Sequence, residues 1–110
     1  MGLFSKKKKY TKLSDMKKFH RKRIKQAVLR KGVNSQDEVI LGKNGGISVT
    51  DDEIILLCDG HEVFRCSTKR TIMAELMSLD GVDIRAYDTN DELKSHVIAY
   101  YEYYNKAIKR

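Results

Sequence analysis

The sequence lacks any run of about 18 apolar residues, which excludes a transmembrane helix. Its first ten residues, MGLFSKKKKY, hold no apolar stretch long enough for a secretory signal peptide. Proline and internal repeats are also absent. At 110 residues the chain has room for one domain with a modest core, and we expect a cytoplasmic protein whose thiols stay reduced.

Cysteine is scarce, and the two that are present are expected to lie far apart. If Asp59-Gly60 forms a two-residue turn, Cys58 faces His61 across a hairpin. The same register places Cys66 opposite Glu53. The cysteines are then about 16 Å apart at about 3.3 Å per residue, whereas a disulfide needs Cα atoms within roughly 7 Å. The sequence therefore predicts that no disulfide forms within the chain.

Positive charge is abundant but unevenly distributed. Residues 1–32 contain thirteen Lys or Arg and one Asp, a net charge of +12. Residues 33–110 contain nine Lys or Arg and fourteen Asp or Glu, a net charge of −5. The overall charge of +7 thus comes from a basic arm attached to a mildly acidic body. This asymmetry indicates an anionic partner for the arm, unless the acidic body itself satisfies it.

The middle of the chain, from Glu38 to Asp88, alternates short apolar runs with turn signals. The pairs Asn44-Gly45, Asp59-Gly60 and Asp80-Gly81 supply the positive φ that a hairpin turn requires. Within several runs, apolar and polar residues alternate, as in strands with one buried and one solvated face. The stretch 71–79 also suits a short helix. We predict six antiparallel strands, at residues 38–42, 46–50, 53–58, 61–67, 71–79 and 82–88.

Two amphipathic helices are predicted on either side of these strands. The first covers residues 13–32: Ser14 or Asp15 caps its start, and Gly32 suits its end. The second begins at the capping box 89–92 and runs nearly to the C-terminus. Its apolar stripe consists of Leu93, Val97, Tyr100, Tyr101, Tyr104, Ala107 and Ile108.

This order of elements resembles the pleckstrin-homology-like (PH-like) superfold, whose bacterial members are closest in size. The likeness is carried by the strand runs from Val39 to Tyr87 and by the apolar stripe that follows them. It implies an α+β fold, in which a meander of six or seven antiparallel strands forms a partly open barrel and the C-terminal helix seals one end. An antiparallel sheet with both helices on one face is the alternative.

On this basis the chain divides into three parts. Residues 1–12 are expected to form a disordered basic tail, because like charges so close together repel one another. Residues 13–32 form the basic amphipathic helix. Residues 38–110 form the PH-like β-domain with its C-terminal helix.

No constellation of catalytic or metal-binding residues is evident. Cys58 and His61 face each other, but no further ligand stands at a recognisable spacing. The glycine-rich loop at 42–46 is followed by a strand, whereas a phosphate-binding loop leads into a helix. The acidic residues at 51–53 are consecutive, whereas calcium loops place their ligands at alternate positions. We therefore predict a non-enzymatic protein with no cofactor, no metal and no small-molecule substrate.

The basic arm is the candidate binding surface, since polybasic segments bind anionic membranes, or nucleic acid without sequence preference. We expect the β-domain to bind a protein partner, which the sequence does not identify, while the arm tethers it to the inner face of the membrane. Leu3 and Phe4 favour a membrane because they stand beside the lysine run. Non-specific nucleic-acid binding is the alternative. The residues are Lys6, Lys7, Lys8, Lys9, Lys17, Lys18, Arg21, Lys22, Arg23 and Lys25.

Two features of the folded protein bear directly on these expectations. An exposed groove beside an unpaired strand edge would indicate where a protein partner binds. A basic arm folded against the acidic body, with its charges paired there, would argue against the tether and for a merely solubilising role.

Overall fold

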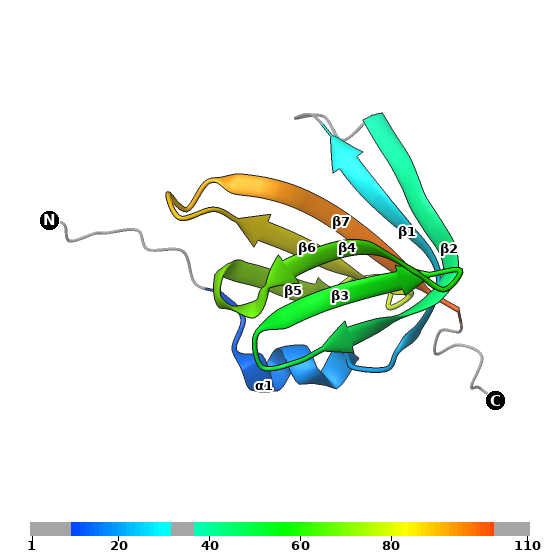
Figure 1. Cartoon of the computed structure of the whole chain (residues 1–110), viewed down its shortest axis with the longest axis horizontal. Helices are drawn as coiled ribbons and strands as arrows, with labels where there is room; N and C mark the ends of the chain where they lie inside the picture. The colour runs from blue at the N-terminus through cyan, green and yellow to red at the C-terminus, as the bar shows by residue number, and fades with distance from the viewer. Residues whose placement is uncertain (1–9, 32–36, 103–110) are drawn as a thin grey trace, which may run out of the picture.

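The computed structural model describes residues 10–31 and 37–102 (Figure 1). Within them, seven strands form one antiparallel sheet that does not close, in the order β4-β3-β2-β1-β7-β6-β5. Two meanders, β1 to β4 and β5 to β7, are joined where β1 pairs with β7. The strands are β1 (Arg23–Lys31), β2 (Asp37–Val49), β3 (Glu53–Cys58), β4 (His61–Ser67), β5 (Thr71–Glu75), β6 (Gly81–Tyr87) and β7 (Leu93–Tyr101).

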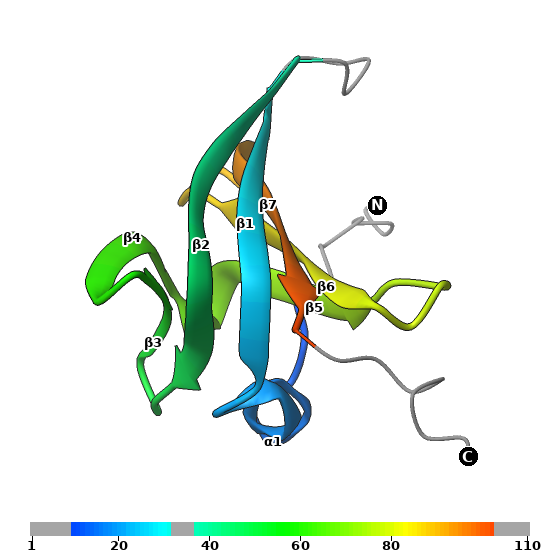
Figure 2. The same ribbon diagram turned by 90° about the vertical axis from the view of Figure 1, so that its right-hand side faces the viewer.

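The helical segments are short. The single turn α1 (Leu13–Met16) continues into the 3₁₀ turn η1 (Lys17–Phe19), and a second 3₁₀ turn, η2 (Thr68–Arg70), links β4 to β5. α1 lies against one end of the curled sheet, where Met16 is fully buried (Figures 1 and 2). No helix in the described ranges is long and apolar enough to cross a membrane.

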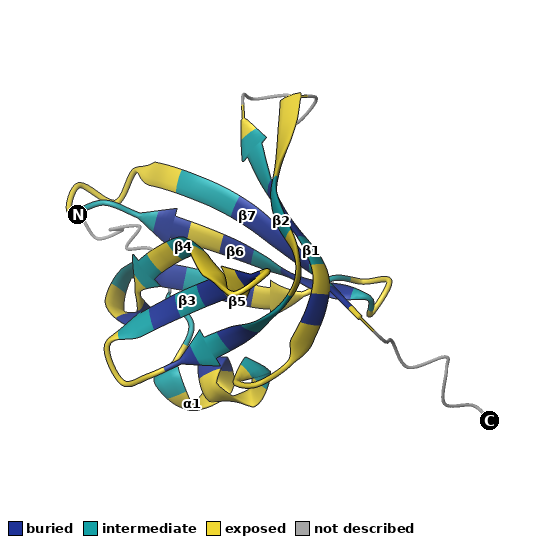
Figure 3. Cartoon of the chain, turned by 45° about the vertical axis from the view of Figure 1, so that its right-hand side comes forward, coloured by how far each residue is buried: buried dark blue, intermediate teal, exposed yellow. Residues whose placement is uncertain are grey.

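The sheet curls around one apolar core (Figure 3). The alternation predicted for β6 is confirmed, because Val82, Ile84 and Ala86 are buried and the polar residues between them are not. The same pattern places one face of β3 in the core. The core consists of Met16, Ile24, Ala27, Ile47, Val49, Ile54, Leu56, Cys58, Met73, Val82, Ile84, Val97, Ala99 and Tyr101.

The β3–β4 hairpin matches its prediction. Both strands have the predicted bounds, and Cys58 pairs with His61 across the Asp59-Gly60 turn, in which both residues have positive φ. A bulge in β4 shifts the register beyond it, so Cys66 faces Ile54, one residue away from the predicted partner. Both cysteines are free, as predicted.

β2 replaces two predicted strands and the turn between them. It runs unbroken from Asp37 to Val49, so the hairpin predicted at Asn44-Gly45 is wrong. Asn44 does have a positive φ of 55°, but it bends a long strand there. A Cβ atom at Gly45 would lie 1.6 Å from the carbonyl oxygen of Leu57 on β3. The glycine is therefore required by the close approach of a neighbouring strand and not by a turn.

The stretch 71–79 is a strand only in its first part. β5 ends at Glu75, and the chain then makes a tight loop into β6. This loop is closed by hydrogen bonds from Leu76 N–H to the Gly81 carbonyl oxygen (2.9 Å) and from Leu79 N–H to the Leu76 carbonyl oxygen (2.8 Å). The strand prediction is thus confirmed for 71–75, and the alternative of a helix is wrong.

The predicted helix over 13–32 is wrong, because only residues 13–16 are α-helical and residues 23–31 form β1. Lys25 is an extra residue of β1 opposite β7, and this bulge places Ile24 and Ala27 on the same, core-facing side. Val28 faces the other side and is also buried, at 3% exposed. A bulged strand that buries both faces therefore repeats its apolar residues at three and four positions, as a helix does.

The predicted C-terminal helix is wrong over the residues that the structure describes. The carboxylate of Asp88 accepts hydrogen bonds from the N–H groups of Asn90 (2.8 Å) and Glu92 (3.0 Å), and this turn leads into β7. β7 lies between β1 and β6, and residues 97–99 are all buried, so its apolar residues cover both faces and imitate a helical stripe. Three residues of the predicted stripe lie outside the described residues: Tyr104, Ala107 and Ile108.

Over the described residues the fold is therefore a mostly β, seven-stranded antiparallel sheet with one short helix, and neither predicted long helix is found there. The tail predicted to be disordered over 1–12 lies mostly outside the described residues, which begin at Tyr10. From there the chain contacts the edge of β5. Thr11 donates its N–H to the Thr71 carbonyl oxygen (3.1 Å), and its hydroxyl accepts from the Met73 N–H (2.9 Å).

Candidate binding groove

β1 and β7 are paired along only part of their length. Their ladder runs from Ile24↔Tyr101 to Leu29↔Val97. Beyond it, the end of β1 pairs with β2 alone, as a two-stranded ribbon that rises away from β7 (Figures 1 and 3). In the described part of the chain, no strand pairs with residues 93–96 on the side that β1 leaves.

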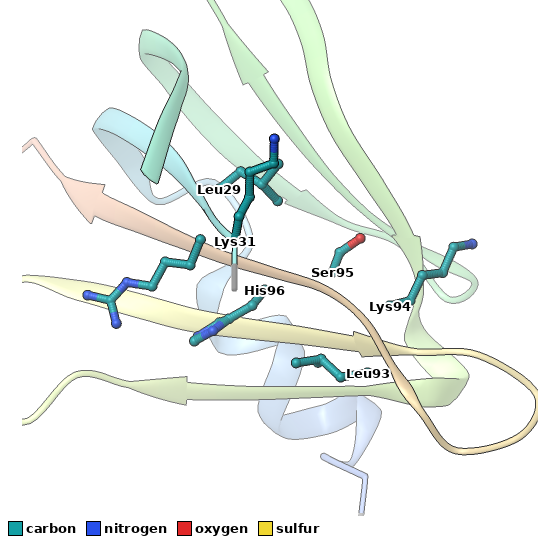
Figure 4. A pocket seen from close by; sticks show the side chains of 7 residues that line it. Leu29, Lys31, Leu93, Lys94, Ser95 and His96 are labelled. Carbon is teal, nitrogen blue, oxygen red and sulfur yellow. The ribbon is translucent and has the colours of Figure 1, made fainter. Parts of the chain in front are cut away.

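A groove of about 490 Å³ lies where the two strands separate (Figure 4). Residues 29–31 line it from β1, and residues 93–96 line it from β7. Leu93 is 53% exposed there, and the ribbon exposes Val39 (43%) and Ile40 (54%). The volume falls within the range of about 300–1,000 Å³ that is typical of ligand sites, and exposed apolar side chains beside polar ones mark such sites.

Two of the basic side chains in the groove are held by acids of the protein. Arg30 Nε donates to the carboxylate of Glu38 at 2.9 Å, on the outer part of the ribbon. His96 Nε2 lies 2.9 Å from the carboxylate of Asp83 on β6, with both side chains mostly buried. Both side chains are therefore already engaged by acids of the protein.

The other two basic side chains, Lys31 and Lys94, form no ion pair with the described residues. They extend from opposite walls of the groove, Lys31 from β1 and Lys94 from β7 (Figure 4). Lys94 occupies a bulge, because Ser95 pairs with Ala86 while Leu93 pairs with the next residue of β6. Bulges redirect side chains and are frequent beside binding sites. The groove thus presents positive charge that the protein's own acids leave unpaired.

A smaller pocket of about 110 Å³ adjoins the groove, and Lys94 and Ser95 line both. Phe64 and Cys66 of β4 form part of its wall. The two arginines that also line it each form an ion pair with acids of the protein. The pocket therefore offers apolar surface beside the unpaired ammonium group of Lys94.

The two thiols do not favour catalysis. Burial, followed by the charge of Asp59, raises the pKa of the Cys58 thiol. Burial is also the main cause that raises the pKa of the Cys66 thiol. Cys58 and His61 are cross-strand partners, yet Cys58 lies in the core at 2% exposed and His61 is exposed. A thiol that stays protonated is a poor nucleophile.

Three of the basic residues predicted to bind an anionic surface are paired with the protein's own acids. They lie on η1 and at the start of β1, and not on one helical face. The Lys17 ammonium group also holds the pKa of the Asp51 carboxyl below its usual value. The ion pairs are Lys17–Asp51 (2.6 Å), Lys18–Asp15 (3.5 Å) and Arg23–Glu102 (2.8 Å).

The remaining described residues of this set, Arg21, Lys22 and Lys25, are exposed. Lys22 Nζ lies 4.9 Å from the centroid of the Tyr101 ring, within cation–π range. Arg21 and Lys25 form no ion pair within residues 10–31 and 37–102. None of the three lines the groove. The lysine run Lys6, Lys7, Lys8 and Lys9 lies outside the described residues.

Sequence reasoning missed the groove. Leu93 and Lys94 fall in the predicted C-terminal helix, and Lys31 falls in the predicted N-terminal one. Their proximity depends on the pairing of β1 with β7, which no motif marks. The only signal is that both strands change from apolar to basic residues towards the same end, and this is visible only once both are known to be strands.

The chain matches no protein-family model, no curated protein and no solved structure. In the ranges that the structure covers, no group of three or more His, Cys, Asp or Glu side chains is arranged to hold a metal ion. The functional conclusion therefore rests on the geometry of the groove and on the charges around it.

Proposed function

We propose that this protein is a non-enzymatic binding module of PH-like architecture, whose β-domain binds a protein partner in the groove between β1 and β7. The observation that carries this proposal is the separation of the two strands after the Leu29↔Val97 pair, which leaves an unpaired strand edge beside a groove. Open strand edges flanked by exposed apolar and basic side chains are surfaces that protein partners use.

The topology supports the PH-like part of the proposal. Meanders of four and three strands, joined into one curled sheet that stays open, are compatible with a partly open barrel. α1 covers one end of this barrel through Met16, and the β1–β2 ribbon rises from the opposite end (Figure 1). The groove is lined by the last residues of β1, where that ribbon begins, and by the first residues of β7. One end of the barrel is thus closed by α1, and the other end carries the proposed binding groove.

The basic arm completes the proposal as a tether to an anionic surface, with a membrane preferred and nucleic acid as the alternative. The ion pairs of Lys17, Lys18 and Arg23 with the protein's own acids argue against a role for these three residues. The support for the tether is therefore the lysine run 6–9 in the sequence, together with the exposed side chains of Arg21, Lys22 and Lys25. Replacing the four lysines by glutamine is expected to abolish co-sedimentation with anionic vesicles. Unchanged sedimentation would refute the tether, and salt-sensitive binding to duplex DNA without vesicle binding would favour the alternative.

The groove is tested by mapping where peptides bind on the full chain. Random peptides displayed on phage are selected against the immobilised protein, and the best binders are added to isotope-labelled protein. We expect amide chemical-shift changes to cluster at residues 29–31 and 93–96, and Leu93→Asp to abolish them. Leu57→Asp is the matched control, because Leu57 is also partly exposed (41%) but lies on β3. Shifts that cluster elsewhere, or equal binding by Leu93→Asp, would overturn the proposal.

A further inference from the structure

We infer that the partner supplies an extended, acidic segment, which adds to the sheet as a further strand along residues 93–96 of β7. This inference rests on the proposed function and specifies the chemistry of the ligand. Backbone amides of the segment pair with the strand edge, and its carboxylates pair with Lys31 and Lys94. Three features lead to it: the open edge, the bulge that keeps it open, and the charge around it.

The edge of β7 offers backbone groups for hydrogen bonding. Residues 93–96 pair with residues 85–87 of β6 on one side. Successive residues of a strand direct their N–H and C=O groups to opposite sides, so about half of these groups point to the side that β1 leaves. No backbone–backbone hydrogen bond within the described residues reaches them there. Such an edge is a template for an incoming strand.

A bulge directs β1 away from this edge. Leu41 is an extra residue of β2 opposite the Ala27–Val28 step, immediately before β1 leaves β7 after Leu29. A bulge bends its strand and increases the local twist, which carries the ribbon outwards. The Arg30–Glu38 ion pair then joins the two strands of the ribbon to each other. The position beside residues 93–96 is thereby left to another chain.

The charge around this position selects an acidic segment. Lys94 stands at the bulge of β7 and Lys31 extends from β1, so the added strand lies between two ammonium groups. A carboxylate on the segment pairs with either one, whereas a lysine or arginine meets like charge. Asp88 forms no ion pair with Lys94, and its carboxylate accepts two backbone N–H groups of its own turn. Those bonds, and to a smaller extent the charge of Lys94, hold the pKa of Asp88 below its ordinary value.

The groove and the smaller pocket that adjoins it contact the apolar side chains of the added strand. Alternate side chains of a strand point to opposite faces. The pairs Leu29↔Val97 and Ser95↔Ala86 place Leu29 and Ser95 on the core-facing side, so side chains on that face of the added strand meet Leu29 and the pocket of about 110 Å³, which takes a small branched side chain. Leu93 pairs with Tyr87 and lies on the other face. The ligand is therefore an extended segment that carries both carboxylates and small apolar side chains.

The mode of binding is tested on the selected peptides that map to the groove. Their sequences are expected to combine acidic residues with small apolar residues. N-methylation of every second backbone amide is expected to weaken binding about tenfold, while methylation of the intervening amides is tolerated, because only one side of an added strand faces β7. Hydrogen exchange at residues 93–96 of the full chain slows on binding.

The charge contribution is tested with Lys31→Gln and Lys94→Gln. Each is expected to weaken peptide binding about fivefold and to reduce its salt dependence. Lys43→Gln is the matched control, because Lys43 is an exposed lysine of β2 that does not line the groove. All three positions are exposed, so the unfolding midpoints of the variants are expected to equal that of the parent protein.

The outcomes separate this inference from the proposed function. Peptides that bind in the groove but tolerate every N-methyl group, or that carry a basic consensus, would overturn the inference and leave the proposed function intact. Peptides that map elsewhere would refute both. Shifts at residues 29–31 and 93–96 that anionic vesicles cause and no peptide causes would identify a membrane ligand, and would also overturn the inference.

Discussion

The seam between β1 and β7 has a closed half, where residues 24–29 meet residues 97–101, and an open half formed by residues 30–31 and 93–96. Most of the closed half is apolar, as where Ala27 pairs with Ala99, and residues 97–99 are buried on both faces, while Lys25 at the bulge is exposed. The open half carries basic side chains, which cannot be buried on both faces without partners. The candidate site therefore begins where the seam can no longer exclude water.

The largest effect is expected from a charge placed in the closed half. Val97 is 0% exposed, so Val97→Asp puts a carboxylate in the core without a partner. We expect the free energy of unfolding to fall by about 4 kcal/mol or more, which is enough to unfold much of a marginally stable domain. Thermal unfolding followed by circular dichroism measures this loss.

Ser95→Asp is the matched variant in the open half, two positions along the same strand and on the same face. Ser95 is only partly buried and lines the groove, so we expect a change within about 1 kcal/mol. If both variants unfold, or if neither does, the two halves do not differ in the way described above.

A smaller effect is expected at the end of the closed half, where the hydroxyl of Tyr101 donates to the carboxylate of Glu75 (3.2 Å). Burial, followed by the charge of Glu75, raises the pKa of Tyr101. The folded state therefore holds the phenolic proton more tightly than the unfolded state does. This contribution to stability is complete below about pH 10 and is lost as the pH rises further.

Tyr101→Phe is expected to cost about 1 kcal/mol at neutral pH and to remove this alkaline loss. Urea unfolding at a series of pH values measures both effects. Tyr100→Phe changes the neighbouring, partly buried tyrosine and is expected to keep the alkaline loss of the parent protein. If Tyr101→Phe still lost the same stability above about pH 10, the loss would come from another titrating group.

The smallest effect is expected in the open half, from the ion pair of Arg30 with Glu38. The two side chains are 30% and 40% exposed, so solvent screens their attraction. Arg30→Met keeps the aliphatic stem and is expected to change the free energy of unfolding by about 0.5 kcal/mol or less, while amide exchange in the ribbon becomes faster. Glu38→Gln is expected to change the free energy of unfolding by the same small amount, and the double variant is expected to be no less stable than either single variant. If Arg30→Met lowered the free energy of unfolding as much as Val97→Asp does, the ribbon would be as important for stability as the core.

Strands marked by a clear turn or by alternating side chains could be predicted from the sequence. β3 and β4 have their predicted bounds because the short Asp59-Gly60 turn separates them, although residues 54–58 are apolar throughout and show no alternation. β6 was predicted because its apolar and polar residues alternate, and the structure buries the apolar ones.

β1 and β7 could not be predicted, because their apolar residues do not follow that period. The bulge at Lys25 and the burial of both faces of each strand produce spacings that a helix explains equally well. Asn44-Gly45 was misread for a related reason. A residue pair that permits positive φ does not reveal whether it ends a strand or only bends one.

The groove could not be predicted because it is a relation between strands from the two ends of the chain. Lys31 and Lys94 are ordinary lysines until β1 is placed beside β7. The basic arm stood out because charge is visible in composition. Composition does not show which of those charges the protein pairs internally, as Asp51 and Glu102 do for Lys17 and Arg23.

The hydrogen bonds of Thr11 with β5 have a practical consequence. β5 is the last strand at one edge of the sheet, and exposed edge strands can pair with the same edge of another copy and cause aggregation. The segment that starts at Tyr10 covers part of this edge and so hinders such pairing. A shortened chain made to remove the leading lysines must therefore retain Tyr10 and Thr11. A truncation that removes them would expose the edge of β5 and promote aggregation. The resulting precipitation would be mistaken for a loss of membrane binding.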